Sequence, residues 1–140
     1  MSVMEILLPV FVQVLLTFVL LFWTGYLRAA DLRGGAVKPK DIALRQPNWT
    51  QRTLQVGNAY HNQLELPVLF YALMILLLVT RQADFLQVAL AWIFVLLRVV
   101  HVYVHVTSNR VQVRGPLFGI GAIVLLIMWA VFMARVIAVA

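Results

Sequence analysis

The segment FLQVALAWIFVLLRVVHVYVHV, residues 85–106, decides the fold class of this chain. Nearly all of its side chains are apolar or aromatic, and a helix of about 20 such residues is long enough to cross the hydrocarbon core of a bilayer. Apolar runs of similar length recur in the chain, at about 4–27, 54–80 and 115–138. The sequence therefore predicts an all-α integral membrane protein, a four-helix bundle formed by a single domain over residues 1–140.

The composition supports a membrane protein and excludes several other classes. Hydrophobic residues make up 64% of the 140, whereas soluble domains contain about 45–50%. The chain has no cysteine, which excludes disulfides, thiolate metal sites and cysteine nucleophiles. Its net charge of +6 comes from basic residues that stand between the apolar runs rather than on one face. The charge therefore indicates membrane topology and not nucleic-acid binding.

The loops between the apolar runs predict the topology. The links at 81–84 and 107–114 are short, so successive helices should be antiparallel in an up-down-up-down bundle. Most Lys and Arg residues lie in the first and third loops: Arg28, Arg33, Lys38, Lys40, Arg45, Arg52, Arg110 and Arg114. By the positive-inside rule these two loops are cytoplasmic, and both termini lie on the non-cytoplasmic side. No basic segment precedes the first run, so we expect a retained helix rather than a signal peptide.

Polar side chains that hydropathy does not explain lie within the second and third runs. The second run carries a stripe with helical spacing: Asn58, His61, Asn62 and Glu65. The third run carries another: Arg98, His101 and His105. Both stripes lie toward the cytoplasmic ends of their helices, so antiparallel packing should bring them face to face.

The charged members of these stripes are expected to turn away from lipid. An ionised Glu65 or Arg98 facing the acyl chains would cost roughly 2.5–3.5 kcal/mol, so an ion pair between them is predicted. One interpretation is that the polar residues only join the helices through hydrogen bonds, worth about 0.6 kcal/mol each. The number of ionisable groups near one membrane face favours a polar pocket instead.

A metal site is a further interpretation of the same residues. His101 and His105 are four residues apart on the third predicted helix, and His61 and Glu65 have the same spacing on the second. Two such pairs facing each other could bind zinc, iron or copper. Arg98, one turn from His101, would repel a cation, so we favour the pocket without a metal.

Two local patterns resemble the MAPEG family, the membrane-associated proteins in eicosanoid and glutathione metabolism. The first is Asn62-Gln63-Leu64-Glu65 followed closely by Pro67. The second is Arg98-x-x-His101 followed at the family's intervals by Arg110 and Arg114. The resemblance covers nearly the whole chain in length, four-helix layout and basic loops. The chain is similar to bacterial-type members of the family, and this similarity implies that the protein lies in the bacterial inner membrane.

The resemblance also implies an assembly, a cofactor and a set of site residues. Family members are homotrimers that bind glutathione between subunits, near the cytoplasmic side. The residues implied to bind the cofactor are Arg28, Asn62, Glu65, Arg98, His101, His105 and Arg110. Arg114 is the implied catalytic residue, because a guanidinium beside the sulfur favours the thiolate. The apolar half of the bundle, in contact with membrane lipid, would hold a lipophilic substrate.

The chain departs from the family's eukaryotic enzymes at three positions. Asn58 and His61 stand where those enzymes carry arginines, and His105 replaces a tyrosine. Neutral histidine and asparagine cannot reproduce bidentate recognition of a carboxylate. From the resemblance we expect a glutathione-dependent transferase or peroxidase that acts on a lipophilic electrophile. The alternatives are a non-catalytic protein of the same fold, either lipid-binding or an assembly partner, and the metal-binding protein described above.

Overall fold

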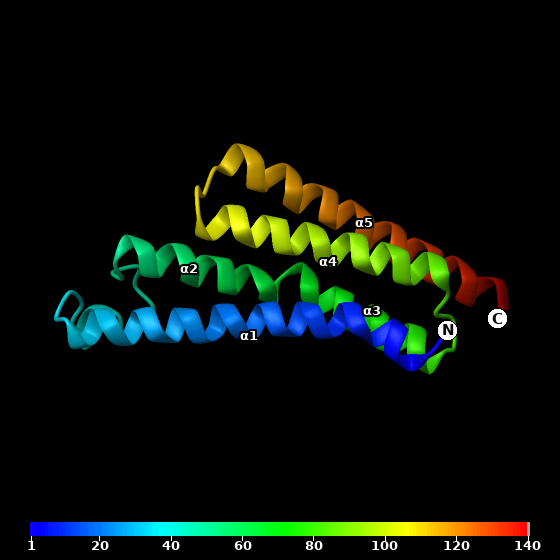
Figure 1. Cartoon of the computed structure of the whole chain (residues 1–140), viewed down its shortest axis with the longest axis horizontal. Helices are drawn as coiled ribbons and strands as arrows, with labels where there is room; N and C mark the ends of the chain where they lie inside the picture. Colours follow the sequence, from blue (N-terminus) through cyan, green and yellow to red (C-terminus); the bar gives the residue numbers. More distant parts are fainter. Residues whose placement is uncertain (140) are drawn as a thin grey trace.

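The computed structural model describes residues 1–139, which form helices aligned along the molecule (Figure 1). Four helical segments are long and apolar enough to cross a membrane, and residues 1–139 contain no strand. The elements in chain order are α1 (Val3–Arg33), η1 (Pro39–Asp41), α2 (Gln51–His61), η2 (Asn62–Leu64), α3 (Leu66–Val79), α4 (Phe85–Val106) and α5 (Val111–Val139). The predicted all-α four-helix membrane bundle is confirmed.

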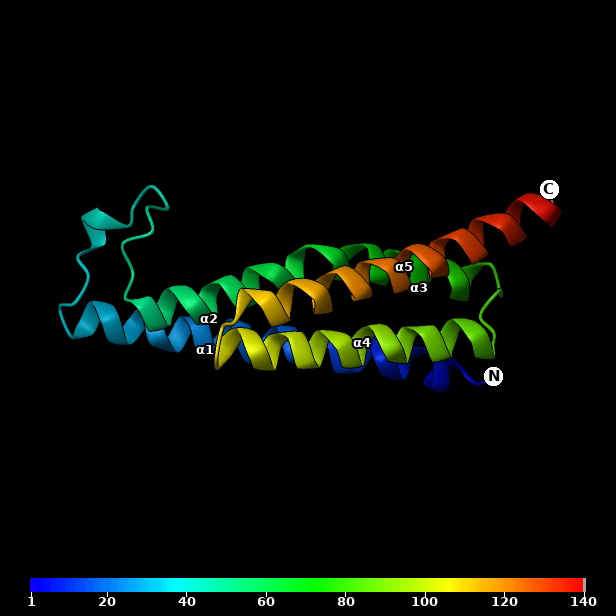
Figure 2. The same cartoon turned by 90° about the horizontal axis from the view of Figure 1, so that it is seen from above.

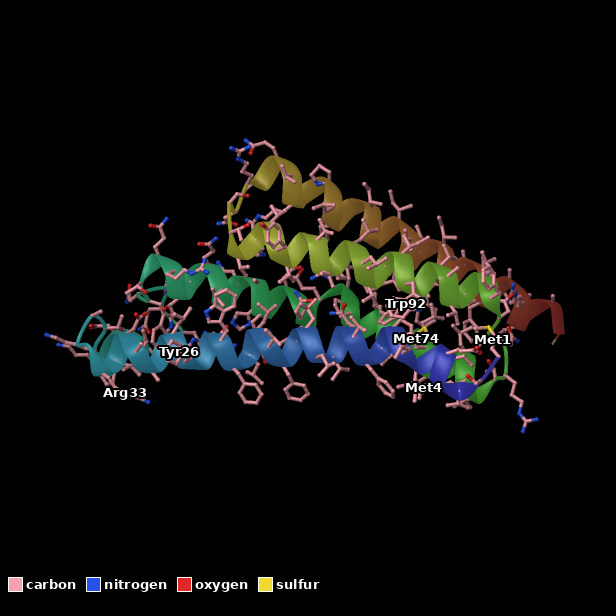
Figure 3. All side chains as sticks on the ribbon, viewed as in Figure 1. Met1, Met4, Tyr26, Arg33, Met74 and Trp92 are labelled. Carbon is pink, nitrogen blue, oxygen red and sulfur yellow. The ribbon has the colours of Figure 1, made fainter. Side chains whose placement is uncertain are left out.

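Successive spans are antiparallel, so the bundle runs up-down-up-down (Figure 1). The two termini lie at the same end as the turn between α3 and α4, and the loop between α1 and α2 projects from the opposite end (Figure 2). The side chains labelled in Figure 3 mark these ends: Met74 and Trp92 lie toward the termini, and Arg33 lies at the loop end. The two basic loops therefore share one end of the molecule.

The second span is divided rather than continuous. The sequence predicts one helix over 54–80, whereas the structure ends α2 at His61 and begins α3 at Leu66. Pro67 favours the break because it has no backbone N–H and its ring crowds the preceding turn. Within the short turn η2, Gln63 accepts a hydrogen bond from Gln13 Nε2 of α1 at 3.0 Å and donates one to the carbonyl of Ala59 at 3.0 Å. The break is thus tied to the first span.

The outer helices are longer than the sequence predicts. α1 begins after Ser2, whose side chain and Glu5 form a reciprocal capping box, and it continues to Arg33 instead of ending near 27. α5 begins at Val111, four residues before the predicted start at 115. Pro116 lies inside this longer helix, where it removes one backbone hydrogen bond.

Two apolar clusters fill the bundle, and a polar layer separates them. The larger cluster joins α3, α4 and α5 around the stacked rings of Phe70 and Phe94, whose centroids are 4.8 Å apart. The smaller cluster joins α1, α2 and α4 and includes Val102. On α4, Arg98 lies between Val95 of the first cluster and Val102 of the second, and only 1% of it is exposed. A buried cation therefore stands beside the break in the second span.

The outer faces of the spans are apolar. In the single chain, the exposed fraction is 70% for Phe22 and 71% for Tyr26 of α1, and 75% for Val79 of α3. Exposed side chains of this size suit contact with lipid tails rather than with water. The chain is therefore built as an integral membrane protein.

Asp84 fixes the turn at the terminal end. Its Oδ1 accepts the backbone N–H of Gln87 at 2.9 Å and caps α4, and its Oδ2 accepts from Arg135 of α5 at 2.7 Å. The hydrogen bond from Arg135 holds the pKa of Asp84 below its ordinary value. One carboxylate thus joins the start of α4 to the end of α5.

Candidate functional site

A cavity of about 340 Å³, here called the polar pocket, lies beside the break in the second span. It is lined by side chains from η2 and its flank, α4 and the first two turns of α5: Asn62, Glu65, His101, Val111, Arg114, Gly115 and Phe118. Four of these residues belong to the set expected from the sequence. The structure therefore brings Asn62, Glu65, His101 and Arg114 together around one space.

Arg98 holds the backbone at the break. Its guanidinium donates to the carbonyl oxygen of Asn62 at 3.0 Å and also to Oδ1 of the same residue. The regular α-helix of the second span stops at this point, and a carbonyl left unpaired in a membrane would cost several kcal/mol by order of magnitude. Arg98 satisfies that carbonyl and fixes the conformation of the turn.

The predicted ion pair between Glu65 and Arg98 is wrong. Within residues 1–139 the only ion pair joins Asp84 and Arg135. Asn62 stands between the two groups instead, since its Nδ2 donates to Glu65 Oε2 at 3.1 Å while its oxygens accept from Arg98. The break turns Glu65 outward, where it is exposed. Its carboxylate therefore faces the polar pocket without a cation of its own.

Arg114 is positioned by His105. Arg114 lies in the first turn of α5, and its guanidinium forms a hydrogen bond with Nε2 of His105 on α4. An arginine can only donate, so His105 accepts through Nε2 and is neutral in this contact. The ring of His105 is edge-on to that of His101, with centroids 5.6 Å apart. A buried pair of imidazoles thus supports the cation at the wall of the polar pocket.

Arg28, Asn58 and His61 lie in a second cavity of about 370 Å³, the loop-side pocket, between α1, α2 and the loop that joins them. His61 and Asn62 are adjacent in sequence, but successive residues of a helix project in directions about 100° apart. The two side chains therefore serve different pockets.

Two of the expected cofactor-binding residues lie outside the polar pocket: Arg28 lines the loop-side pocket, and Arg110 lines neither cavity. Arg110 is exposed and does not line the polar pocket, so the structure does not bring it to the other expected cofactor-binding residues. The alternative metal site would require His61 and Glu65 to face His101 and His105. Among the described residues 1–139, no group of three or more potential ligands gathers in that way.

A separate apolar groove of about 490 Å³ lies between α3 and α5. Its walls are aliphatic or aromatic apart from the sulfur of one methionine: Leu66, Leu69, Ala122, Leu125, Leu126, Trp129 and Met133. Leu66 follows Glu65 directly, and Ala122 lies one turn beyond Phe118. The two cavities share no lining residue, but these neighbours in the sequence place the apolar groove beside the polar pocket.

Comparison with protein-family models matches residues 6–134 of this chain to the MAPEG family. The chain belongs to the MAPEG family. Comparison with curated proteins and with solved structures gives no significant match. Family membership confirms the resemblance, and MAPEG proteins are glutathione-related transferases or peroxidases of the membrane.

The polar pocket of this MAPEG chain includes wall residues that the sequence analysis missed. Val111, Gly115 and Phe118 have the spacing i, i+4 and i+7 on one face of α5, the face that also carries Arg114. That spacing was available in the sequence. The expected start of the helix at 115 hid it, because it placed Val111 and Arg114 in a loop.

Proposed function

We propose that this MAPEG protein is a glutathione-dependent transferase or peroxidase that acts on a lipophilic electrophile. The observation that carries the proposal is that the polar pocket and the apolar groove lie beside each other along α3 and α5. Arg114, Glu65 and Asn62 line the polar pocket, and the side chains that line the groove are apolar. A hydrophilic thiol in the pocket would therefore lie beside a lipophilic acceptor in the groove.

The polar pocket suits two of the charged groups of glutathione. Arg114 is a fixed cation suited to a thiolate, and the exposed carboxylate of Glu65, free of any ion pair, is suited to an ammonium group. Among the residues that line this pocket Arg114 is the only cation. The two carboxylates of the tripeptide therefore require cations from outside the pocket of a single chain.

Glutathione, when bound, supplies the nucleophilic sulfur. Arg114 stabilises negative charge at the pocket wall, and His105 fixes the direction of its guanidinium. Asn62 holds the Glu65 carboxylate in place through Nδ2, and Arg98 holds Asn62. Phe118 gives the pocket an apolar wall near Arg114, and charge interactions are stronger in less polar surroundings.

A homotrimer, the usual assembly of the MAPEG family, would supply the missing cations. The polar pocket opens on the outer surface of the bundle, where Glu65 and Gly115 are exposed. A neighbouring subunit seated there would close it. Native mass spectrometry of the protein in a neutral detergent should give the mass of three chains, and a monomer would contradict this part of the proposal.

We propose further that the end with the two basic loops is cytoplasmic. The chain has no natural cysteine, so single cysteines at Gln82 and Ser108 can report on the two ends. In intact cells a membrane-impermeable maleimide should label Gln82→Cys and spare Ser108→Cys. The reverse pattern would invert the topology.

The first test of the proposed function is binding of glutathione. If the polar pocket binds it, the free energy of unfolding rises by about 2.7 kcal/mol at a ligand concentration one hundred times Kd. Arg114→Leu should lose this stabilisation. Arg33→Leu is the matched control, because Arg33 is an exposed arginine at the end of α1 and lines neither polar cavity. An equal response of both variants would remove Arg114 from the site.

The second test is turnover. The purified protein should conjugate glutathione to 1-chloro-2,4-dinitrobenzene or reduce a lipid hydroperoxide, and Arg114→Leu should lower kcat more than the affinity for glutathione if Arg114 stabilises charge in the transition state. Binding of glutathione without any turnover would favour the non-catalytic alternative.

A further inference from the structure

The C-terminal end of α4 needs hydrogen-bond donors from outside its own helix. The last carbonyl groups of an α-helix have no partner within the helix, and an unpaired carbonyl is costly in a membrane protein. The following turn supplies two donors: the backbone N–H of Thr107 donates to the carbonyl of Tyr103 at 3.2 Å. The backbone N–H of Asn109 donates to the carbonyl of Val104 at 2.8 Å. The next carbonyls, at 105–107, require other donors.

Two side chains of α2 supply these donors. Nε2 of Gln55 donates to the carbonyl of His105 at 2.8 Å and to that of Thr107 at 3.1 Å. The guanidinium of Arg52 donates to the carbonyl of Val106. Arg52 and Gln55 are three residues apart, so both side chains project from one face of α2. Together they satisfy the carbonyls at the end of α4.

Arg52 is itself held by α1. Its guanidinium lies over the indole of Trp23, 5.0 Å from the ring centroid. The face of the ring attracts a cation, and the negative end of the α4 dipole does the same. Neither Arg52 nor Gln55 lines the polar pocket or the loop-side pocket. Any effect of these two residues on the site must therefore pass through the groups that they hold.

The end of α4 carries the residue that positions Arg114. His105 is buried, its carbonyl accepts from Gln55, and its Nε2 forms a hydrogen bond with the guanidinium of Arg114. Only residues 107–110 separate α4 from α5, so the last turn of α4 also determines where the first turn of α5 lies. Helix ends fray when their terminal groups lose partners. Fraying here would release His105 and Arg114 together.

We propose that Gln55 and Arg52 are positioning residues for the proposed reaction and act on Arg114 through the end of α4. This inference rests on the proposed function, in which Arg114 stabilises the thiolate of glutathione. Loss of either donor leaves a carbonyl unpaired, and the guanidinium of Arg114 is then no longer held at the pocket wall. The bound thiol ionises less readily and turnover falls, although every side chain that lines the two polar cavities is still present.

The test compares variants of the full chain in neutral detergent by the ionisation of bound glutathione. The ultraviolet absorbance of the thiolate, followed as the pH is raised, gives the ionisation constant of the bound thiol. Gln55→Met removes the donor at similar volume, and it should lower this constant and kcat about fivefold, which corresponds to about 1 kcal/mol. Arg52→Met should lower both values as well. Arg52→Lys should restore them, because an ammonium group keeps a donor for the carbonyl of Val106.

Gln87→Met is the matched control for a loss of stability alone. Gln87 is buried in the first turn of α4, at the opposite end from His105, and its Nε2 donates to the carbonyl of Met128 at 3.1 Å. The variant thus removes the same kind of hydrogen bond away from the polar pocket. Its ionisation constant and its kcat per folded protein should match those of the wild type, whatever its thermal stability. Arg114→Leu gives the full loss for comparison.

The results separate this inference from the proposed function. A wild type that does not bind glutathione, or does not favour its thiolate, would refute the proposed function. A normal wild type and a deficient Arg114→Leu, with Gln55→Met equal to Gln87→Met, would refute the inference alone. Equal values for Arg52→Met and Arg52→Lys would remove the donor at position 52 from it. Because Arg52 is exposed, its variants keep the test valid should Gln55→Met fail to fold.

Discussion

Replacing Asn62 by leucine tests the arrangement on which the polar pocket rests. The change removes Oδ1, which accepts from Arg98, and Nδ2, which donates to Glu65 at 3.1 Å. Interhelical hydrogen bonds in membrane proteins average about 0.6 kcal/mol and reach about 1.7. The bond to Arg98 is buried and charge-assisted and belongs near the upper figure, whereas the bond to the exposed Glu65 belongs near the lower. We expect a loss of about 2 kcal/mol in the free energy of unfolding.

The assay is thermal unfolding in detergent micelles, compared with Asn58→Leu as the matched control. Asn58 precedes Asn62 by one turn of α2, is exposed and lies in the loop-side pocket, so its replacement should change stability by less than about 0.5 kcal/mol. Asn62→Leu should also lose stabilisation by glutathione. A double-mutant cycle with Arg98→Leu isolates the pair. Additive effects, or equal stability of the two asparagine variants, would refute a role for Asn62 as the link between Arg98 and Glu65.

Two further predictions concern parts of the fold outside the polar pocket. Asp84→Asn keeps the cap of α4 but loses the ion pair with Arg135. Because these side chains are partly exposed, the free energy of unfolding at pH 7 should fall by less than about 1 kcal/mol. Folding lowers the pKa of Asp84, so this stabilisation is present above the ordinary carboxyl pKa of 3.8 and is lost as the pH falls below it. Acid-unfolding curves of the wild type and of Asp84→Asn will show this loss. Gly57→Ala should stabilise the protein by about 0.5–1 kcal/mol, because the added methyl group meets Thr24 Cγ2 at an ordinary 3.6 Å and helical glycine is unfavourable. Thermal unfolding measures this gain, and a loss would mean that α1 and α2 cannot separate by even a few tenths of an ångström.

The fold could be predicted from the sequence because each span is signalled by its own composition. Runs such as 85–106 satisfy the length of the bilayer whatever their neighbours do, and the structure begins and ends α4 at these residues. The ends of α1 and α5 were less well predicted, since charged or glycine-containing segments can continue a helix beyond the hydrocarbon. Hydropathy records where a helix is buried in lipid and not where it stops.

The candidate site was predicted in its residues but not in its contacts. Helical spacing placed Asn62 and Glu65 opposite His101, and the family resemblance supplied Arg114; in the structure all four line one cavity. The predicted ion pair assumed an unbroken helix, in which Glu65 would face the third span along with Asn62. The break between α2 and α3 leaves Glu65 exposed, and Arg98 donates to the carbonyl and the side chain of Asn62 instead. A three-residue turn thus changed the partner of Arg98, and spacing alone cannot reveal such a turn.

This exchange of partners leads to a prediction for Glu65. In an ion pair with a buried arginine, Glu65→Gln would leave that cation uncompensated and cost about 3–5 kcal/mol. In the present structure Nη2 of Arg98 donates to the carbonyl and Oδ1 of Asn62, whereas no ion pair joins Arg98 to Glu65 among residues 1–139, and a glutamine oxygen at position 65 can still accept from Asn62 Nδ2. Thermal unfolding of Glu65→Gln should therefore match that of the wild type within about 0.5 kcal/mol. The same variant should bind glutathione less tightly, because a neutral amide cannot pair with the ammonium group. A large loss of stability would show that Glu65 and Arg98 are paired after all, and unchanged binding would show that the free carboxylate has no ligand.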